Sequence, residues 1–293
     1  MQRENQRHAP TMSSSNDGDL DVLRTTHFIG NGPLQTAYNE CGEGPVFLMV
    51  HGYTGSKLDF TSQLDWFSDI RRVIAYDQRG HGESSNQWPY TFDCLANDLV
   101  GLLDELGIAS CDLLGHSLGG MVAMRAVLQH PDRFGSVILM DTTAEPLKMW
   151  PGKVRDQLGA LILEQGCEAM LPMMQSQSAT PAAQRGIDYL GEEEHWQRIG
   201  TKLSQMDPEA WLGLGDEISG AASVLNDLAS LTCPTTIVYG QNDDAFVQPS
   251  KAMAALIGNS RLVEIPSAGH SPQYENADPW RDAIREHLLG AAG

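Results

Sequence analysis

The chain has 293 residues, of which 41% are hydrophobic, so it is long enough to bury a large core. Its formal charge is −19, from 38 acidic and 19 basic residues. Such an acidic chain repels phosphate backbones and anionic lipid surfaces, which argues against nucleic acid and membranes as partners. Its five cysteines are dispersed and form no CxxC pair, which indicates free thiols in a reducing compartment.

The first twenty residues are polar and rich in serine, and they lack the apolar segment of a secretory signal. We predict a disordered lead over residues 1–20. No apolar run in the sequence reaches the roughly 18 residues needed to span a membrane. These features predict a cytoplasmic protein. The sequence leaves its oligomeric state, monomer or homodimer, open.

Short apolar runs alternate with helical patterns along much of the chain. Residues 20–28 and 34–40 suit an antiparallel edge of a sheet. Continuous apolar runs bounded by turn signals then predict strands covered on both faces. These runs occupy residues 45–50, 72–76, 111–114, 136–140, 235–239 and 261–265.

Helical patterns fall between the predicted strands. Residues 91–106 place leucines on one stripe, residues 117–129 follow the third run directly, and residues 277–289 close the chain. Alternating strands and helices predict a mainly parallel sheet with helices on both faces. We assign this α/β core domain to residues 21–141 and 232–293.

The alternation stops between residues 142 and 231. This stretch is rich in helix formers and contains no clear strand, and it is longer than connections in parallel sheets usually are. We predict a helical lid inserted over the active edge of the sheet. Its methionine and aromatic side chains either pack the lid onto the core or line a pocket beneath it. They are Met149, Trp150, Met170, Met173, Met174, Tyr189, Trp196, Met206 and Trp211.

A GxSxG pattern, Gly-His-Ser-Leu-Gly, occupies residues 115–119. Chance can supply so short a pattern, but this one lies directly after an apolar run and opens a helical one. That is the strand–turn–helix setting of a nucleophile elbow, in which the two glycines let strand and helix pass closely. We therefore predict that Ser117 is a nucleophile at the carboxyl edge of the sheet.

A serine hydroxyl needs a base, and His270 is the candidate. It follows the last predicted strand in the sequence Ile-Pro-Ser-Ala-Gly-His at residues 265–270. A histidine at the carboxyl end of that strand can reach Ser117.

An acid must orient the imidazole, and the run at residues 235–239 leads to two aspartates, Asp243 and Asp244. Either gives the order Ser, Asp, His along the chain that this type of fold uses, and we favour Asp243. Asp141, at the end of the fourth run, is a third candidate for which we expect a structural role.

Acyl transfer also needs hydrogen-bond donors for the developing oxyanion. The first parallel run ends in His-Gly-Tyr-Thr-Gly at residues 51–55. We predict that the backbone N–H groups of Tyr53 and Leu118 form the oxyanion hole, and that Gly52 together with these two residues contacts substrate. We expect His51 to order this loop rather than to carry protons.

The chain resembles the α/β-hydrolase superfamily, in particular 3-oxoadipate enol-lactonases and related small esterases. The resemblance extends over about residues 45–290, apart from the lid. It rests on HGYTGS at His51, YDQRGHGESS at Tyr76, LLGHSLGGMVAMRAVLQHPDRFGSVILMD at Leu113, YGQNDDAFV at Tyr239 and IPSAGHSPQYENAD at Ile265. It implies an eight-stranded, mostly parallel sheet, supports Asp243 as the acid, and assigns Arg79 and His81 to a structural turn. A serine nucleophile argues against epoxide hydrolases and haloalkane dehalogenases, which resemble this fold but use aspartate.

The predicted activity is hydrolysis of a small carboxylic ester or lactone through an acyl-enzyme on Ser117, without a metal or organic cofactor. Carbon–carbon bond hydrolysis, thioesterase, amidase and cofactor-free haloperoxidase chemistry stay open as alternatives. A non-enzymatic alternative is a small-molecule receptor on the same fold, because fold does not fix function.

Overall fold

The computed structural model describes residues 25–30, 34–149, 151–176 and 180–291. Eight strands of the described chain form one sheet in the order β1-β2-β4-β3-β5-β6-β7-β8, in which β2 is antiparallel to both β1 and β4 and all other neighbouring strands are parallel. The strands are β1 (His27–Ile29), β2 (Thr36–Cys41), β3 (Val46–Val50), β4 (Arg72–Tyr76), β5 (Cys111–His116), β6 (Phe134–Met140), β7 (Thr235–Gly240) and β8 (Ser260–Ile265). The predicted parallel sheet and its antiparallel edge are confirmed.

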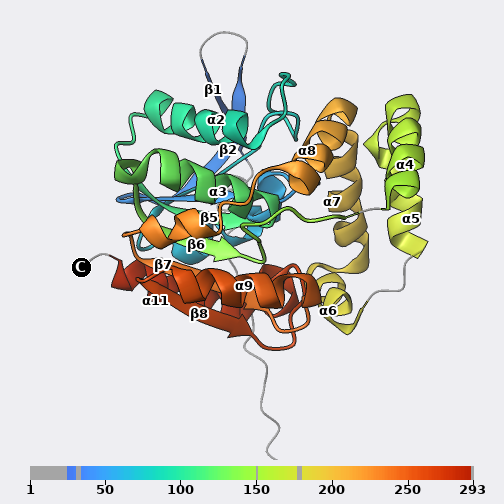
Figure 1. The fold of residues 1–293 in the computed structure, drawn as a ribbon. Helices are drawn as coiled ribbons and strands as arrows, with labels where there is room; N and C mark the ends of the chain where they lie inside the picture. The colour runs from blue at the N-terminus through green and yellow to red at the C-terminus, as the bar shows by residue number, and fades with distance from the viewer. Residues whose placement is uncertain (1–24, 31–33, 150, 177–179, 292–293) are drawn as a thin grey trace, which may run out of the picture.

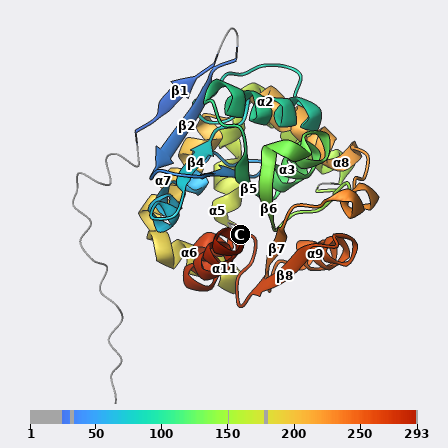
Figure 2. The same cartoon turned by 90° about the vertical axis from the view of Figure 1, so that its left-hand side faces the viewer.

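Helices cover both faces of this sheet, because the side chains of a central strand alternate between two apolar cores. In β3, Leu48 and Val50 face the core shared with α2 (Phe92–Glu105) and α3 (Leu118–Gln129). Phe47 and Met49 face the other core, to which α11 (Ala277–Gly290) contributes. Figure 2 shows α11 on the opposite side of the sheet from α2 and α3.

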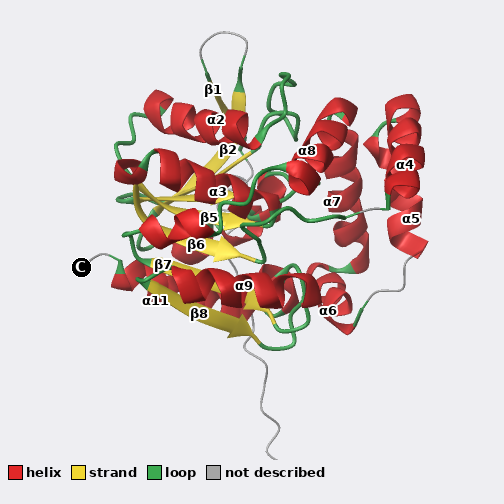
Figure 3. Cartoon of the chain, in the orientation of Figure 1, coloured by secondary structure: helices red, strands yellow, loops and turns green. Residues whose placement is uncertain are grey.

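The described residues between β6 and β7 form helices and no strand. Figures 1 and 3 show the α-helices among them grouped at one end of the sheet. They are α4 (Gly152–Gln165), η5 (Cys167–Met170), α5 (Leu171–Ser176), α6 (Pro181–Leu190), α7 (Glu192–Ser204), α8 (Pro208–Gly220) and η6 (Asn226–Ser230). We call this stretch the 142–231 segment.

Short helices complete the described chain. After β3 come η1 (Lys57–Asp59), η2 (Thr61–Gln63) and η3 (Asp65–Phe67), and η4 (Pro131–Arg133) follows α3. After β7 come α9 (Asp244–Leu256) and, beyond β8, α10 (Pro272–Glu275). No helix of the described residues has both the length and the apolar character that a membrane span requires.

The structure refines several sequence predictions. Helix α2 begins at Phe92, because the Thr91 hydroxyl accepts a hydrogen bond from the Cys94 amide and caps the helix. Cys94 and Cys111 both have apolar neighbours in the sequence, but only Cys111 is buried and Cys94 is half-buried. The predicted disordered lead over residues 1–20 lies outside the described residues.

Candidate active site

Ser117 occupies a strained turn between β5 and α3. Its φ of 54° lies in the left-handed region, which costs a residue other than glycine free energy. A Cβ on Gly115 would lie 2.4 Å from the Gly119 carbonyl oxygen, so the strand and helix can pass only because residue 115 is glycine. The Ser117 carbonyl accepts a hydrogen bond of 2.6 Å from the Thr142 hydroxyl. The predicted strand–turn–helix geometry is therefore present.

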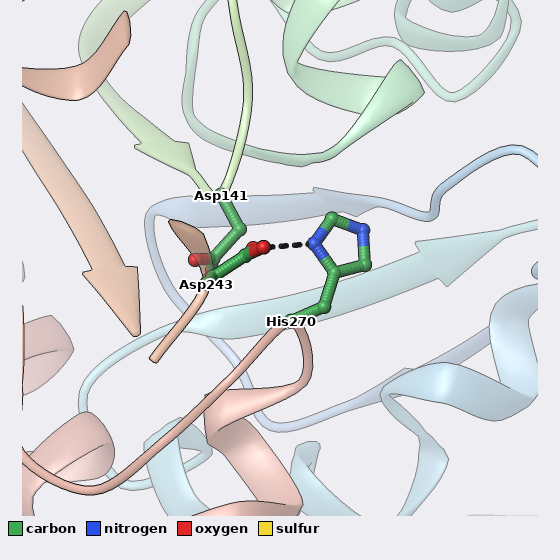
Figure 4. A group of neighbouring side chains, drawn as sticks. All are labelled: Asp141, Asp243 and His270. Atoms are coloured by element: carbon green, nitrogen blue, oxygen red, sulfur yellow. Dashed lines mark hydrogen bonds and ion pairs between the residues drawn. The ribbon is translucent and has the colours of Figure 1, made fainter. Parts of the chain in front are cut away.

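His270 and Asp243 contact each other at the same edge of the sheet. The Nδ1 atom of His270 lies 2.6 Å from Oδ2 of Asp243 (Figure 4). Asp244 is the exposed first residue of α9, and Phe246 of that helix stacks on the imidazole at 5.0 Å between ring centroids. The structure thus brings Asp243, and not Asp244, against the predicted base.

Two groups that sequence reasoning did not single out hold the loop that carries His270. The Glu275 carboxylate accepts hydrogen bonds from the amides of Gly269 and Ser271. His116 Nε2 donates to the His270 carbonyl at 2.8 Å. Burial lowers the pKa of His116 to about 3, so this imidazole is neutral at pH 7. His116 occupies a variable position of GxSxG, which carries no sequence signal for this role.

Ser117 and His270 line one cavity of about 530 Å³, which Gly52, Tyr53 and Leu118 also line. Although Ser117 and His270 both lie in the part of the chain that the structure describes, no hydrogen bond joins the Ser117 hydroxyl to the His270 ring. Such hydrogen bonds are often long in free enzymes and tighten when substrate binds. The structure therefore brings all the predicted site residues to one cavity without closing the contact between Ser117 and His270.

The loop after β3 presents the two amides that the sequence predicts as oxyanion donors. Within the described chain, neither the Tyr53 nor the Leu118 N–H donates a hydrogen bond to another protein group. The Tyr53 carbonyl accepts from His81 Nε2 at 2.6 Å, and the Tyr53 hydroxyl donates to the Trp211 carbonyl of α8. Tyr53 is thus fixed through its carbonyl and its hydroxyl, while its amide is free to bind a ligand.

His51 has the structural surroundings that we expected. It is fully buried, and its Nε2 accepts a hydrogen bond of 3.0 Å from the Gln78 amide. Burial lowers the pKa of His51 to about 3. A buried, neutral imidazole joined to two loops orders them and does not exchange protons with a substrate. Arg79, which the resemblance assigns to a structural turn, makes an ion pair with Asp98.

The walls of the cavity are largely apolar. Met149 and Met174 of the 142–231 segment line it, whereas Met170, Met206 and Trp211 are buried in the core. The predicted methionine and aromatic set is therefore divided: some members line the cavity and some are buried, whereas Met173 and Trp196 are half-buried and Tyr189 is exposed. Trp150 lies outside the described residues. The apolar side chains that line the cavity are Leu118, Met121, Leu147, Met149, Met174, Ala183, Leu190, Ile199, Leu203, Ile218 and Phe246.

Charged groups on the wall are already paired. Lys202 of α7 contacts Asp59 of η1 at 2.6 Å. Arg198 of α7 donates to the Leu58 carbonyl at 3.1 Å and to the Ser62 hydroxyl at 2.8 Å. Helix α7 is therefore attached by two cations to the chain that follows the Tyr53 loop.

One group of side chains has the composition of a metal site. Asp141, Asp243 and His270 each place one donor atom within 4.8 Å of the other two. The hydrogen bond between Asp243 and His270 occupies a pair of these donor atoms. The cluster is thus built as an acid–base pair with a further carboxyl group beside it.

Comparisons with known proteins agree with this architecture. A family model described as alpha/beta hydrolase fold matches residues 45–163. The mouse sn-1-specific diacylglycerol lipase ABHD11 is 28% identical over 269 residues, which are 87% of this chain and 86% of that protein. The 3-oxoadipate enol-lactonase 2 of Acinetobacter baylyi is 27% identical over 224 residues, 76% of this chain and 80% of that protein.

Among solved structures, a thermophilic esterase from Thermogutta terrifontis superimposes with a TM-score of 0.79 at 28% identity, over 91% of this chain and 99% of that one. The chain therefore has the α/β-hydrolase fold that its motifs predict. Its resemblance to α/β hydrolases that are named lipase, lactonase and esterase is confirmed.

Proposed function

We propose that the protein is a serine hydrolase that cleaves a carboxylic ester or lactone of a small molecule through an acyl-enzyme on Ser117. His270 is its base, Asp243 its acid, and the Tyr53 and Leu118 amides its oxyanion donors. The observation that carries the proposal is the 2.6 Å contact between Asp243 and His270 at the cavity that Ser117 lines from its strained turn. A structural protein has no need of this combination.

In the first half of the reaction, His270 Nε2 takes the proton of the Ser117 hydroxyl as the oxygen attacks the substrate carbonyl carbon. The developing negative charge lies on the former carbonyl oxygen, and the two amides bind it. Asp243 stabilises the imidazolium through Nδ1–H. When the intermediate collapses, the carbon–oxygen bond to the alcohol breaks and His270 gives the alcohol its proton.

In the second half, a water molecule replaces the alcohol. His270 removes a proton from the water as its oxygen attacks the acyl carbon. The same amides bind the second oxyanion, and collapse returns the proton to Ser117 and releases the carboxylic acid. These steps require no metal or organic cofactor.

The 142–231 segment is the lid in this proposal, and residues 21–141 and 232–293 form the core domain. The support is geometric, since Met149 and Met174 of the segment and Ser117 of the core line the same cavity. Because the wall is apolar, it favours an acyl or alcohol group with hydrocarbon character. We assign the protein to the cytoplasm, because its five cysteines are free in the structure and free thiols are typical of reducing compartments.

Active-site labelling tests the proposal. A fluorophosphonate should label the wild-type protein at Ser117 and should fail to label a folded Ser117→Ala variant. The variant should also lose roughly 10⁴-fold or more in kcat/KM on simple esters. Competition by acyl esters of graded chain length and by lactones of several ring sizes would then narrow the range of candidate substrates. Labelling elsewhere, or full esterase activity in Ser117→Ala, would refute the nucleophile assignment.

Turnover kinetics separate the enzyme from a receptor on the same fold. Repeated fast turnover is expected here. A single slow turnover followed by a stable complex with a partner protein would instead support a receptor.

A further inference from the structure

A second carboxyl group is buried behind the proposed acid. Asp141 follows β6, is fully buried and adopts a φ of 42°. Its amide donates to the Val238 carbonyl at 2.9 Å, and its Oδ1 accepts from the Gly240 amide at 2.8 Å. These contacts fix Asp141 against the end of β7. Figure 4 shows its side chain beside that of Asp243.

The other oxygen of Asp141 has no donor. In the described chain, no N–H or O–H group reaches the buried Oδ2 atom. One atom each of Asp141, Asp243 and His270 lie within 4.8 Å of one another. Two carboxylates in such proximity are both acceptors and repel each other, so a buried pair is stable only when one of them holds a proton.

The surroundings favour a proton on Asp141. The Asp243 carboxylate is 11% exposed and contacts His270, whereas Asp141 is completely enclosed. Burial and, after it, the charge of Asp243 hold the pKa of the Asp141 carboxyl well above its usual range. The Glu275 carboxylate of α10 acts in the same direction. Among the described residues, the titratable groups that bear on Asp141 are Asp243, His270 and Glu275.

The geometry points to Asp141 as a neutral carboxylic acid that donates its proton from Oδ2 to the Asp243 carboxylate and so aims Asp243 at His270. Asp141 is then a positioning residue, and this inference rests on the proposed function. Among the described residues, His270 is the one side-chain hydrogen-bond partner of the Asp243 carboxylate. A hydrogen bond from Asp141 would hold the Asp243 carboxylate at a second point. Buried carboxylic acids kept neutral at pH 7 are known hydrogen-bond donors in active sites.

Steady-state kinetics on Asp141 variants test the inference. Asp141→Ala should lower kcat about tenfold with little change in KM, because it removes a charge-assisted hydrogen bond that orients the acid. Asp141→Asn should restore most of that loss, because an amide can donate to Asp243 and accept from Gly240. In an Asp243→Asn background, Asp141→Ala should cause no further loss. If Asp141 only stabilised the fold, its removal would lower the unfolding midpoint and leave kcat per folded molecule unchanged.

The pH profile and the infrared spectrum report whether the Asp141 carboxyl group holds a proton. Asp141→Asn replaces a neutral group by a neutral group, so the acidic limb of kcat/KM should not move. If Asp141 were ionised, losing its charge would shift that limb to lower pH and overturn the inference. The infrared band of a protonated carboxyl should be present at pH 7 in wild type and absent in Asp141→Asn, and its absence from wild type would also overturn it.

These outcomes are distinct from failure of the proposed function. Full activity in Asp243→Asn or Ser117→Ala would refute the triad itself. An inactive Asp243→Asn together with a fully active, folded Asp141→Ala would refute the role of Asp141 alone.

Discussion

The carboxylate of Asp243 lies 2.6 Å from Nδ1 of His270, while its sequence neighbour Asp244 is exposed to solvent. Two adjacent aspartates are therefore separated by the turn that opens α9, since Asp243 precedes the helix and Asp244 is its first residue. An acid at Nδ1 fixes the tautomer in which Nε2 is free to accept a proton. Only Asp243 is in position to do this.

Substitution of the two aspartates should therefore have very different effects. Asp243→Asn should lower kcat on a simple ester by roughly 10³–10⁴-fold, because an amide favours the wrong imidazole tautomer. Asp244→Asn is the matched control and should stay within about twofold of wild type, because an exposed side chain away from His270 contributes little. Steady-state kinetics measure both, and the reverse pattern would reassign the acid.

The hydroxyl of Tyr53 joins the proposed oxyanion loop to the 142–231 segment. It donates to the Trp211 carbonyl in α8 and lies 2.8 Å from where a Cβ of Gly215 would be, so glycine makes room for it. Tyr53→Phe keeps the amide donor but loses this bond. We expect a decrease in kcat of about fivefold, which corresponds to about 1 kcal/mol. Gly215→Ala should have a similar effect by displacing the hydroxyl.

Tyr90→Phe is the control for this prediction. The Tyr90 hydroxyl also donates to the start of α8, at the Asp207 carboxylate, but Tyr90 does not line the cavity. Its loss should lower thermal stability without changing kcat. Equal kcat losses in Tyr53→Phe and Tyr90→Phe would indicate that any weakening of α8 slows the reaction, and would contradict a specific role for Tyr53.

Much of the sheet and of the proposed site could be predicted, because both depend on local patterns. Continuous apolar runs mark buried parallel strands, and β4 has the same bounds as its run. Ser117, Asp243 and His270 each follow such a run within five residues. Because the carboxyl ends of parallel strands lie at one edge of a sheet, three residues that follow such strands are expected to lie near that edge.

The rest depends on contacts between distant segments. Glu275 and His116 hold the His270 loop through backbone groups, which no residue pattern records. The contact between Tyr53 and α8 depends on how the 142–231 segment packs on the core. Helical periodicity predicts that the segment has helices but not where they lie. Cys94 illustrates the same limit, since its neighbours in the sequence are apolar and yet it is only half-buried.

A buried histidine far from the cavity should make stability depend on pH. His287 Nδ1 contacts the Thr236 hydroxyl and Nε2 the Ser136 hydroxyl, each at 2.8 Å. Burial lowers the pKa of His287 to about 4, whereas an unfolded histidine titrates near 6.5. Between these values the unfolded chain binds more protons, so stability falls as pH falls from about 6.5 to 4.

We therefore expect His287→Gln to reduce the slope of unfolding free energy against pH in that window. The reduction should be at most about 1.4 kcal/mol per pH unit, the contribution of one proton. Urea unfolding at several pH values measures it, and comparison with wild type cancels the contributions of other groups. His27→Gln is the control, because His27 is exposed and its replacement should leave the slope unchanged. An unchanged slope in His287→Gln would show that His287 is not buried in its neutral form.

The ion pair between Lys202 and Asp59 should hold the 142–231 segment to the core. The two side chains are 17% and 13% exposed and lie 2.6 Å apart. Lys202→Met leaves a nearly buried carboxylate without its partner, which should lower the free energy of unfolding by about 3 kcal/mol. The double variant Lys202→Met/Asp59→Asn should recover part of this loss, because no unpaired charge is then buried.

An exposed ion pair supplies the matched control. Arg281 lies 3.0 Å from Asp278, whose side chain is 78% exposed, so Arg281→Met should cost no more than about 0.5 kcal/mol. Denaturant unfolding compares the three variants, and KM on an ester substrate should rise with Lys202→Met, because α7 lines the cavity through Ile199 and Leu203. Equal losses in Lys202→Met and Arg281→Met, or a double variant less stable than Lys202→Met, would contradict a buried attachment at this point.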